Sequence, residues 1–212
     1  MADERASSAD VSATEAYDQL GLQRINLKLG VELPAGSNAD SISDQVLSVF
    51  GRWRLEEGEE ILDLADYSHI PDGPGVVLVG HLWHFGIDWG YGRPGLYYAS
   101  RRNLTGPLDQ RLEQALTGLL EKSIRLLADD DMQPAPLPRC GDLQIQINDR
   151  LRHPNNAASE AEFRPAVEAL VARIYGGKAE IEPETDPGER LGWRVKATTA
   201  PASLAEVRAA LA

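Results

Sequence analysis

The sequence predicts an α+β fold: two βαββ-like units, joined by a hairpin and a long helix, form a mainly antiparallel sheet with helices on one face. Residues 25–33 and 143–148 alternate apolar and polar side chains, which is typical of strands with one buried face. Each of these segments is followed by a helix-forming segment and then by two shorter strand-forming segments. Paired units of this kind bury their apolar faces in a shared core.

The first unit begins with the strand Ile25–Leu33, and a helix follows from about Ser41. Apolar residues recur in this helix at helical spacing, namely Ile42, Val46, Val49, Phe50 and Trp53. Short strands are expected at Ile61–Ala65 and Val76–Val79. The turn-forming residues 71–75 between them predict that these two strands pair as a hairpin.

The connection to the second unit contains a strand at Leu96–Ser100 and the longest helix of the chain. This helix is expected to begin near Gly106-Pro107, because proline suits the first helical turn. Asp129–Asp131 end it, and Pro134–Pro138 form a proline-rich linker.

The second unit begins with the strand Leu143–Asn148. Proline inside a helix disrupts it, so we expect a short turn followed by a helix over Pro165–Tyr175, capped by Gly176-Gly177. Residues 179–182 and 191–196 then form a last hairpin. Ile25, Leu27 and Leu29 align with Leu143, Ile145 and Ile147. True duplication and chance similarity of two βαββ units explain this match equally well.

These elements divide the chain into three parts. Residues 1–22 are expected to form a flexible N-terminal tail, and residues 23–198 a single α+β domain with halves at about 25–80 and 143–196. Residues 199–212 contain a C-terminal helix, for which Ser203 and Glu206 have the spacing of a capping box. The small, polar opening residues do not form a secretory signal, and no apolar run is long enough to span a bilayer.

The composition excludes several classes of function. The 212 residues include 33 acidic and 21 basic side chains, for a net charge of −12, so we expect neither a nucleic acid nor a membrane as partner. Cys140 is the single cysteine, which excludes an intrachain disulfide and a paired-cysteine zinc or redox motif. An acidic, cytoplasmic protein is the expectation.

The segment 80–98 is unusually rich in glycine, aromatic and imidazole side chains. Aromatic rings and arginine offer rigid contact area, so we expect a protein-binding or assembly domain that uses this segment for a protein partner or for self-association. The candidate binding residues are His69, His81, Trp83, His84, Trp89 and Arg93. The alternative is a β-ribbon whose aromatic side chains simply cover the sheet.

A metal-dependent, hydrolase-like enzyme is a second hypothesis, with His81, His84 and Asp88 as ligands and His69 as acid or base. The spacing argues against it if the segment is a strand, because residues three apart then face opposite sides. Asp66, Ser68 and His69 lack the sequence context of a nucleophilic triad, so no catalytic residue or cofactor is assigned.

A small-ligand sensor is the third hypothesis, with a pocket between the two βαββ units and a site around His69, His81 and His84. A further polar cluster, Asn148–Arg150 with His153 and Asn155-Asn156, is explained most simply by loop capping.

Several motifs resemble an uncharacterised bacterial protein family with no assigned function. They are Asp66–Gly75, Gly80-His81, Gly92–Tyr97, Ile147–Leu151 with Pro154-Asn155, and Phe163–Pro165 through Ile174–Gly176. The resemblance spans about residues 25–177, and the segment Leu82–Trp89 departs from the family's pattern. It implies no activity, cofactor or site residue.

Overall fold

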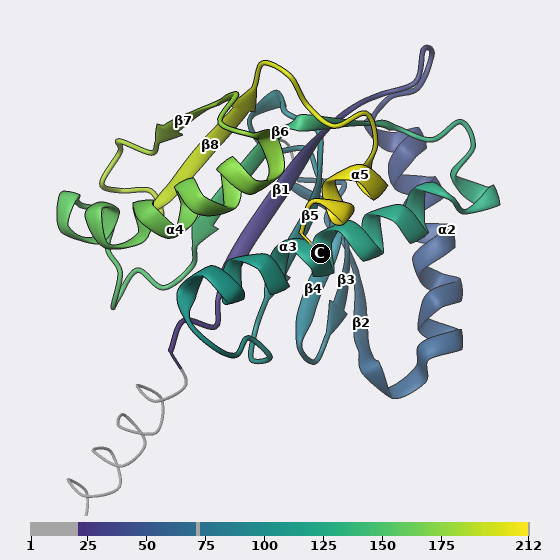
Figure 1. Ribbon diagram of the computed structural model, residues 1–212. Helices are drawn as coiled ribbons and strands as arrows, with labels where there is room; N and C mark the ends of the chain where they lie inside the picture. Colours follow the sequence, from purple (N-terminus) through teal and green to yellow (C-terminus); the bar gives the residue numbers. More distant parts are fainter. Residues whose placement is uncertain (1–20, 71–72, 212) are drawn as a thin grey trace, which may run out of the picture.

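A computed structural model describes residues 21–70 and 73–211 (Figure 1). The strands of these residues form one eight-stranded sheet. The predicted tail, residues 1–22, lies outside the described residues except for Gly21 and Leu22. The strand order is β2-β3-β4-β5-β1-β6-β8-β7, and every neighbouring pair is antiparallel. The strands are β1 (Ile25–Glu32), β2 (Ile61–Asp66), β3 (Pro74–Gly80), β4 (Trp83–Asp88), β5 (Gly95–Ser100), β6 (Leu137–Ile147), β7 (Ala179–Pro183) and β8 (Gly192–Ala197).

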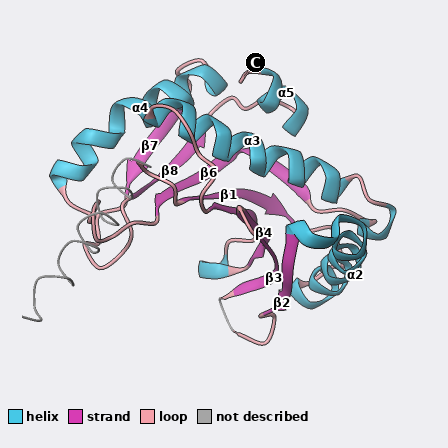
Figure 2. Ribbon diagram, turned by 90° about the horizontal axis from the view of Figure 1, so that it is seen from below, coloured by secondary structure: helices cyan, strands magenta, loops and turns pink. Residues whose placement is uncertain are grey.

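The α-helices of the described residues lie along one face of this curved sheet, and the opposite face is concave (Figure 2). They are α2 (Ala39–Glu57), α3 (Leu108–Leu127), α4 (Ala157–Tyr175) and α5 (Leu204–Ala209), with short 3-10 helices η1 (Gly58–Glu60), η2 (Gly90–Gly92) and η3 (Asp130–Met132). Helix α2 contacts β2, β3 and β4, whereas α3 contacts β5 and β1. The predicted α+β class, with a mainly antiparallel sheet and helices on one face, is confirmed.

The two predicted βαββ units are β1-α2-β2-β3 and β6-α4-β7-β8. In the second unit the last strand lies between the first two, in the order β6-β8-β7. The first unit has the corresponding order, except that the hairpin β4–β5 is inserted between β1 and β3. The units meet at the antiparallel pair β1–β6, whose register is symmetric about the pair Leu27–Ile145. The shared order is a structural finding and does not by itself establish duplication.

The core lies between the sheet and the helices. On β1 and β6 the buried rows Ile25, Leu27, Leu29 and Leu143, Ile145, Ile147 face the helices, as the alternation predicts. Phe85 of β4 is fully buried, and its ring centroid lies 5.7 Å from that of Phe50 on α2. The aromatic segment therefore contributes to the scaffold, as the ribbon alternative expects.

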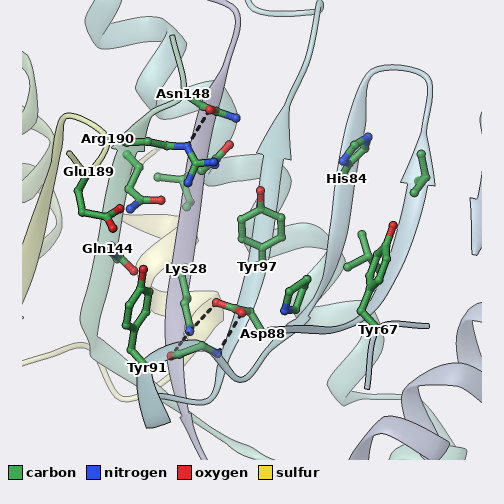
Figure 3. A pocket seen from close by; sticks show the side chains of 17 residues that line it. Lys28, Tyr67, His84, Asp88, Tyr91, Tyr97, Gln144, Asn148, Glu189 and Arg190 are labelled. Atoms are coloured by element: carbon green, nitrogen blue, oxygen red, sulfur yellow. Dashed lines mark hydrogen bonds and ion pairs between the residues drawn. The ribbon is translucent and has the colours of Figure 1, made fainter. Parts of the chain in front are cut away.

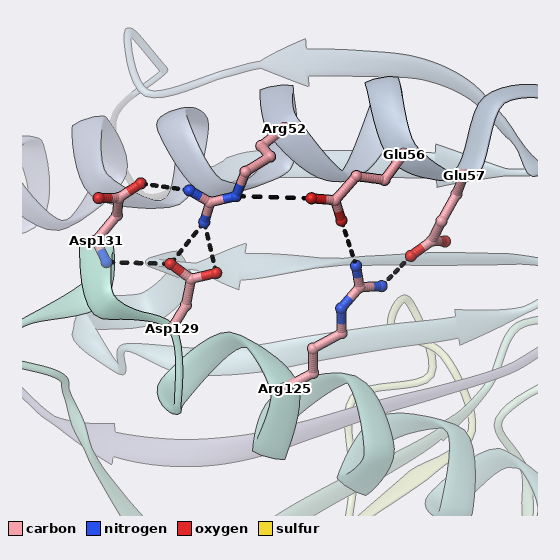
Figure 4. A network of polar contacts seen from close by, with 6 residues as sticks. All are labelled: Arg52, Glu56, Glu57, Arg125, Asp129 and Asp131. Carbon is pink, nitrogen blue, oxygen red and sulfur yellow. Dashed lines mark hydrogen bonds and ion pairs between the residues drawn. The ribbon is translucent and has the colours of Figure 1, made fainter.

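A network of ion pairs joins α2 to the end of α3 and to η3 (Figure 4). It consists of Arg52, Glu56, Glu57, Arg125, Asp129 and Asp131. Arg52 bonds to Asp129 at 2.6 Å and to Asp131 at 2.7 Å, and these hydrogen bonds raise the pKa of its guanidinium. Arg125 also stacks over the Trp53 ring at 3.9 Å. The network ties the helix that covers β2–β4 to the helix that covers β5 and β1.

The prediction that Pro165 interrupts its helix was wrong, because α4 runs without a break from Ala157 to Tyr175. The Asn156 side chain caps the helix by accepting the Ser159 N–H at 2.9 Å. Phe163, in the turn before the proline, is buried and packs on the His153 ring at 4.7 Å. An interior proline costs roughly 3 kcal/mol. Burial of an aromatic side chain, worth about 1.5–3 kcal/mol, offsets much of that cost.

The predicted linker Pro134–Pro138 is shorter than expected, because β6 already begins at Leu137. Residues 137 and 138 pair with β1 beyond a register shift between Leu29 and Val31, while the pairing with β8 starts only at Asp142. Pro138 therefore lies where the strand has one neighbour, which is where a sheet tolerates proline. Cys140 follows in the same strand and is buried.

None of the helices in the part of the chain that the structure describes combines the length and the apolar character needed to cross a bilayer.

We predict that Phe85→Ala lowers the free energy of unfolding by about 3–5 kcal/mol, because it leaves a cavity between β4 and α2. Leu82→Ala, in the same segment but 45% exposed, should cost less than about 1 kcal/mol. Urea denaturation of the two variants measures both values. Equal losses in the free energy of unfolding would contradict a scaffold role for Phe85 in segment 80–98.

Candidate functional site

A pocket of about 430 Å³, here called the main pocket, opens on the concave face of the sheet (Figure 3). A second hollow of about 410 Å³, the side pocket, lies next to it. Both are lined by Lys28, Gly90, Tyr91, Gln144, Gln146 and Glu189. Because the α-helices cover the other face, the groove formed by the two pockets is built from the side chains that alternate with the core residues.

The floor of the main pocket comes from the three central strands. Asn26 and Lys28 of β1 lie opposite Gln146 and Gln144 of β6, and Lys28 also lies opposite Tyr97 of β5. Amide side chains therefore cover the seam between the two βαββ units.

Gly86 lies between Val77 and Tyr97 in the same row of the sheet. A Cβ atom at position 86 would stand 2.2 Å from the Val76 carbonyl oxygen, so no other residue fits without moving β3 away from β4. The missing side chain adds depth to the concave face between its neighbours.

The two ends of the main pocket differ in chemistry. Tyr97 lies in the centre of Figure 3, with Arg190 and Glu189 to its left and Tyr67 and His84 to its right. Val77, Val79 and Pro74 of β3, the strand that pairs with the His84 strand β4, also line the pocket and make its β3 side largely apolar. The left-hand end is polar, because Asn148 and the amide side chains of β6 lie there.

A half-buried ion pair holds the loop that carries Tyr91. The Lys28 ammonium lies 2.6 Å from the Asp88 carboxylate and donates to the Gly90 carbonyl at 3.3 Å, while Asp88 accepts the Gly90 N–H at 3.1 Å. Tyr91 follows with φ +61°, the single positive φ outside glycine in the described residues. Its ring is 80% exposed beside both pockets. Backbone strain of this kind concentrates at functional sites.

Arg190 points its guanidinium into the main pocket. Its Nε donates to Asn148 Oδ1 at 2.8 Å, and no carboxylate among the described residues forms an ion pair with it. Burial raises the pKa of Tyr97 to about 12, with the Arg190 charge acting in the opposite direction. Tyr97 therefore stays a neutral phenol at physiological pH and can donate a hydrogen bond to a ligand.

Two buried polar atoms in the groove have no hydrogen-bond partner among the described residues: Asn26 Oδ1 in the main pocket and Arg194 Nε in the side pocket. Asn26 is 5% exposed, and buried side-chain oxygens are normally hydrogen-bonded, so this acceptor is available to a donor that enters the pocket. A third such atom, Ser123 Oγ, lies on helix α3 and lines neither pocket.

His84 faces the main pocket from β4. Its Nε2 lies 3.2 Å from Nη1 of Arg101, and because arginine can only donate, Nε2 accepts and Nδ1 carries the proton. Burial, together with the Arg101 charge, lowers the pKa of His84. The side chain is therefore a neutral imidazole at pH 7.

The structure does not assemble the predicted metal ligands His81, His84 and Asp88. His84 and Asp88 share the concave face of β4, but they are engaged with Arg101 and Lys28. His81 is exposed in the turn between β3 and β4. Within residues 21–70 and 73–211, no three His, Cys, Asp or Glu side chains are arranged to hold a metal ion.

Of the candidate binding residues, His84 lines the main pocket and Arg93 the side pocket. Trp83 packs on the core beneath Lys122, whose ammonium lies 3.7 Å from the ring, and Trp89 donates to Ser43 Oγ at 3.2 Å. His69 and His81 are exposed and line neither pocket. Binding of a protein partner by segment 80–98 stays a prediction, and the exposed large hydrophobic side chains of this segment are Leu82 and Tyr91.

Sequence reasoning missed most of the groove. The missed residues are Asn26, Lys28, Tyr67, Tyr91, Tyr97, Gln144, Gln146, Asn148, Glu189, Arg190 and Arg194. A signal for several of them was present, because they are the polar members of the alternating strands.

No protein-family model matches the chain, and no curated protein matches it.

We predict that stability falls as the pH drops from 7 towards 5, and that His84→Gln removes part of this fall. The pKa of His84 is lower in the folded protein than in the unfolded chain, so the unfolded chain takes up a proton first as the pH falls. Proton uptake by the unfolded chain lowers the free energy of unfolding below about pH 6.5. Thermal unfolding at several pH values measures the difference between the two proteins. His81→Gln, at an exposed position, is the control and should keep the wild-type dependence.

Proposed function

We propose that the protein binds a small polar organic molecule in the main pocket. The observation that carries this proposal is Asn26 Oδ1, a buried acceptor without a partner in the floor of a pocket. An unsatisfied buried polar group costs about 1–3 kcal/mol. A hydrogen-bond donor on a ligand would remove that cost.

The position of Asn26 supports a binding role. It lies on β1 between the core residues Ile25 and Leu27, next to Ala99 on one side and Gln146 on the other. A leucine at this position would avoid the unsatisfied oxygen. Residues that break a local rule without structural benefit are expected at functional sites.

The rest of the main pocket has the character of a small-molecule site. Such sites are typically concave, with apolar and aromatic walls and a few converging polar groups. Here Tyr67, Val77, Val79 and Tyr97 supply the walls, and Asn26, His84 and Arg190 are among the polar groups. The pocket also lies at the seam of the two βαββ units, where the small-ligand hypothesis expects a site, and of the three histidines expected there it contains His84.

We predict that Asn26→Leu separates stability from binding. The unliganded variant should be as stable as the wild type or more stable, by up to about 1–3 kcal/mol, because it no longer buries an unpaired oxygen. A thermal-shift screen of metabolites should identify compounds that stabilise the wild type by mass action but not the variant.

Ser123→Ala is the matched control, because it removes the other unpaired buried oxygen, which lies outside both pockets. It should leave the ligand-induced shift unchanged. A strongly destabilised Asn26→Leu would show that Asn26 serves the fold, and an unchanged ligand response in it would place binding elsewhere.

A further inference from the structure

We infer that the ligand is a zwitterion of the α-amino-acid type, with its carboxylate on Arg190, its ammonium on Glu189 and an apolar side chain against β3. This inference rests on the proposed function and specifies its ligand class. It comes from the way the charges of the main pocket are paired.

Arg190 supplies an oriented site for a carboxylate. Its Nε donates a hydrogen bond to Asn148 Oδ1 at 2.8 Å, and this bond orients the plane of the guanidinium. The Nη groups form no hydrogen bond with a described residue. Glu189, which precedes Arg190 in the sequence, does not pair with them. A planar guanidinium with free N–H groups is suited to bidentate contact with a carboxylate.

Glu189 supplies the opposite charge. It is half-buried, lines both pockets and forms no ion pair with any described Lys, Arg or His. In Figure 3 its carboxylate and the Arg190 guanidinium both extend toward the pocket, and the two groups do not pair with each other. Lys28 and Asp88 neutralise one another at 2.6 Å, so Glu189 and Arg190 remain in the main pocket as one negative and one positive group without an ionic partner.

This charge pattern excludes other common ligand classes. A polyphosphate is disfavoured because the adjoining side pocket has carboxylates as well as the basic side chains Arg93 and Arg194, and because the chain has a net charge of −12. The side-pocket carboxylates are Asp142, Glu184, Asp186 and Glu189. A neutral sugar would leave both half-buried charges without an ionic partner. A zwitterion has no net charge and satisfies both groups, and its ammonium has further N–H donors for Asn26 Oδ1.

The opposite end of the pocket defines the body of the ligand. Val77, Val79 and Pro74 form an apolar surface there, and Tyr67 and the neutral imidazole of His84 add rings. We therefore expect an aliphatic or aromatic side chain rather than a charged one, because a charge would be buried there without a partner.

Calorimetric titration with phenylalanine and two analogues tests the inference. Phenylalaninamide lacks the carboxylate and 3-phenylpropionate lacks the ammonium, so each should bind about 10- to 100-fold more weakly than phenylalanine. Aspartate and lysine should bind more weakly than phenylalanine, leucine or valine.

Two variants assign the contacts. Arg190→Gln should weaken phenylalanine and 3-phenylpropionate by about 10- to 100-fold and leave phenylalaninamide unchanged. Glu189→Gln should weaken phenylalanine and phenylalaninamide and leave 3-phenylpropionate unchanged. Arg150→Gln and Glu180→Gln, at exposed positions outside both pockets, are the controls and should have no effect.

The outcomes separate this inference from the proposed function. If no amino acid binds but another compound stabilises the wild type and not Asn26→Leu, the ligand class is wrong and the proposed function stands. If amino acids bind and Arg190→Gln weakens all three probes equally, the assigned orientation is wrong. If no compound stabilises the wild type, both proposals fail.

Discussion

The register between β1 and β6 is the constraint on which the rest of the structure depends. It places Ile25, Leu27 and Leu29 opposite Ile147, Ile145 and Leu143 beneath the helices, and it thereby places Asn26 and Lys28 opposite Gln146 and Gln144 on the free face. A shift by one residue would exchange these two sets. The apolar core and the polar floor are therefore specified by the same pairing, and neither can change without the other.

The α-helices all lie on one side of the sheet, and the sheet curves away from them, so its other side is concave. Gly86 allows β3 and β4 to approach closely, and the ion pair Lys28–Asp88 fixes the loop that carries Tyr91. The groove thus depends on backbone proximity and on one half-buried ion pair. Its polar side chains are consequently left available for contacts other than folding.

The sequence predicted most strands and helices, because alternation in β1 and β6 and the apolar stripes of α2 and α3 are local signals. The site was harder to predict. The aromatic composition of residues 80–98 predicted a binding segment, yet Phe85 is buried beneath α2 and Trp83 packs on the core. Asn26, Tyr97 and Arg190 are far apart in sequence and meet only through the strand order β5-β1-β6-β8, which no local pattern encodes. The prediction that Pro165 interrupts its helix was wrong for a similar reason, since the packing of Phe163 outweighed the local preference of proline against a helix interior.

The hairpin inserted between β1 and β3 makes the two sides of the groove unequal. The central pair β1–β6 is nearly two-fold symmetric, but one side adds β4 and β5 before β3 is reached, whereas the other passes directly to β8. A ligand bound on this symmetric base as proposed would meet an apolar wall in one direction and charged groups in the other. The base, the wall and the charged groups would contact it from three directions, so the proposed binding mode would distinguish mirror-image molecules.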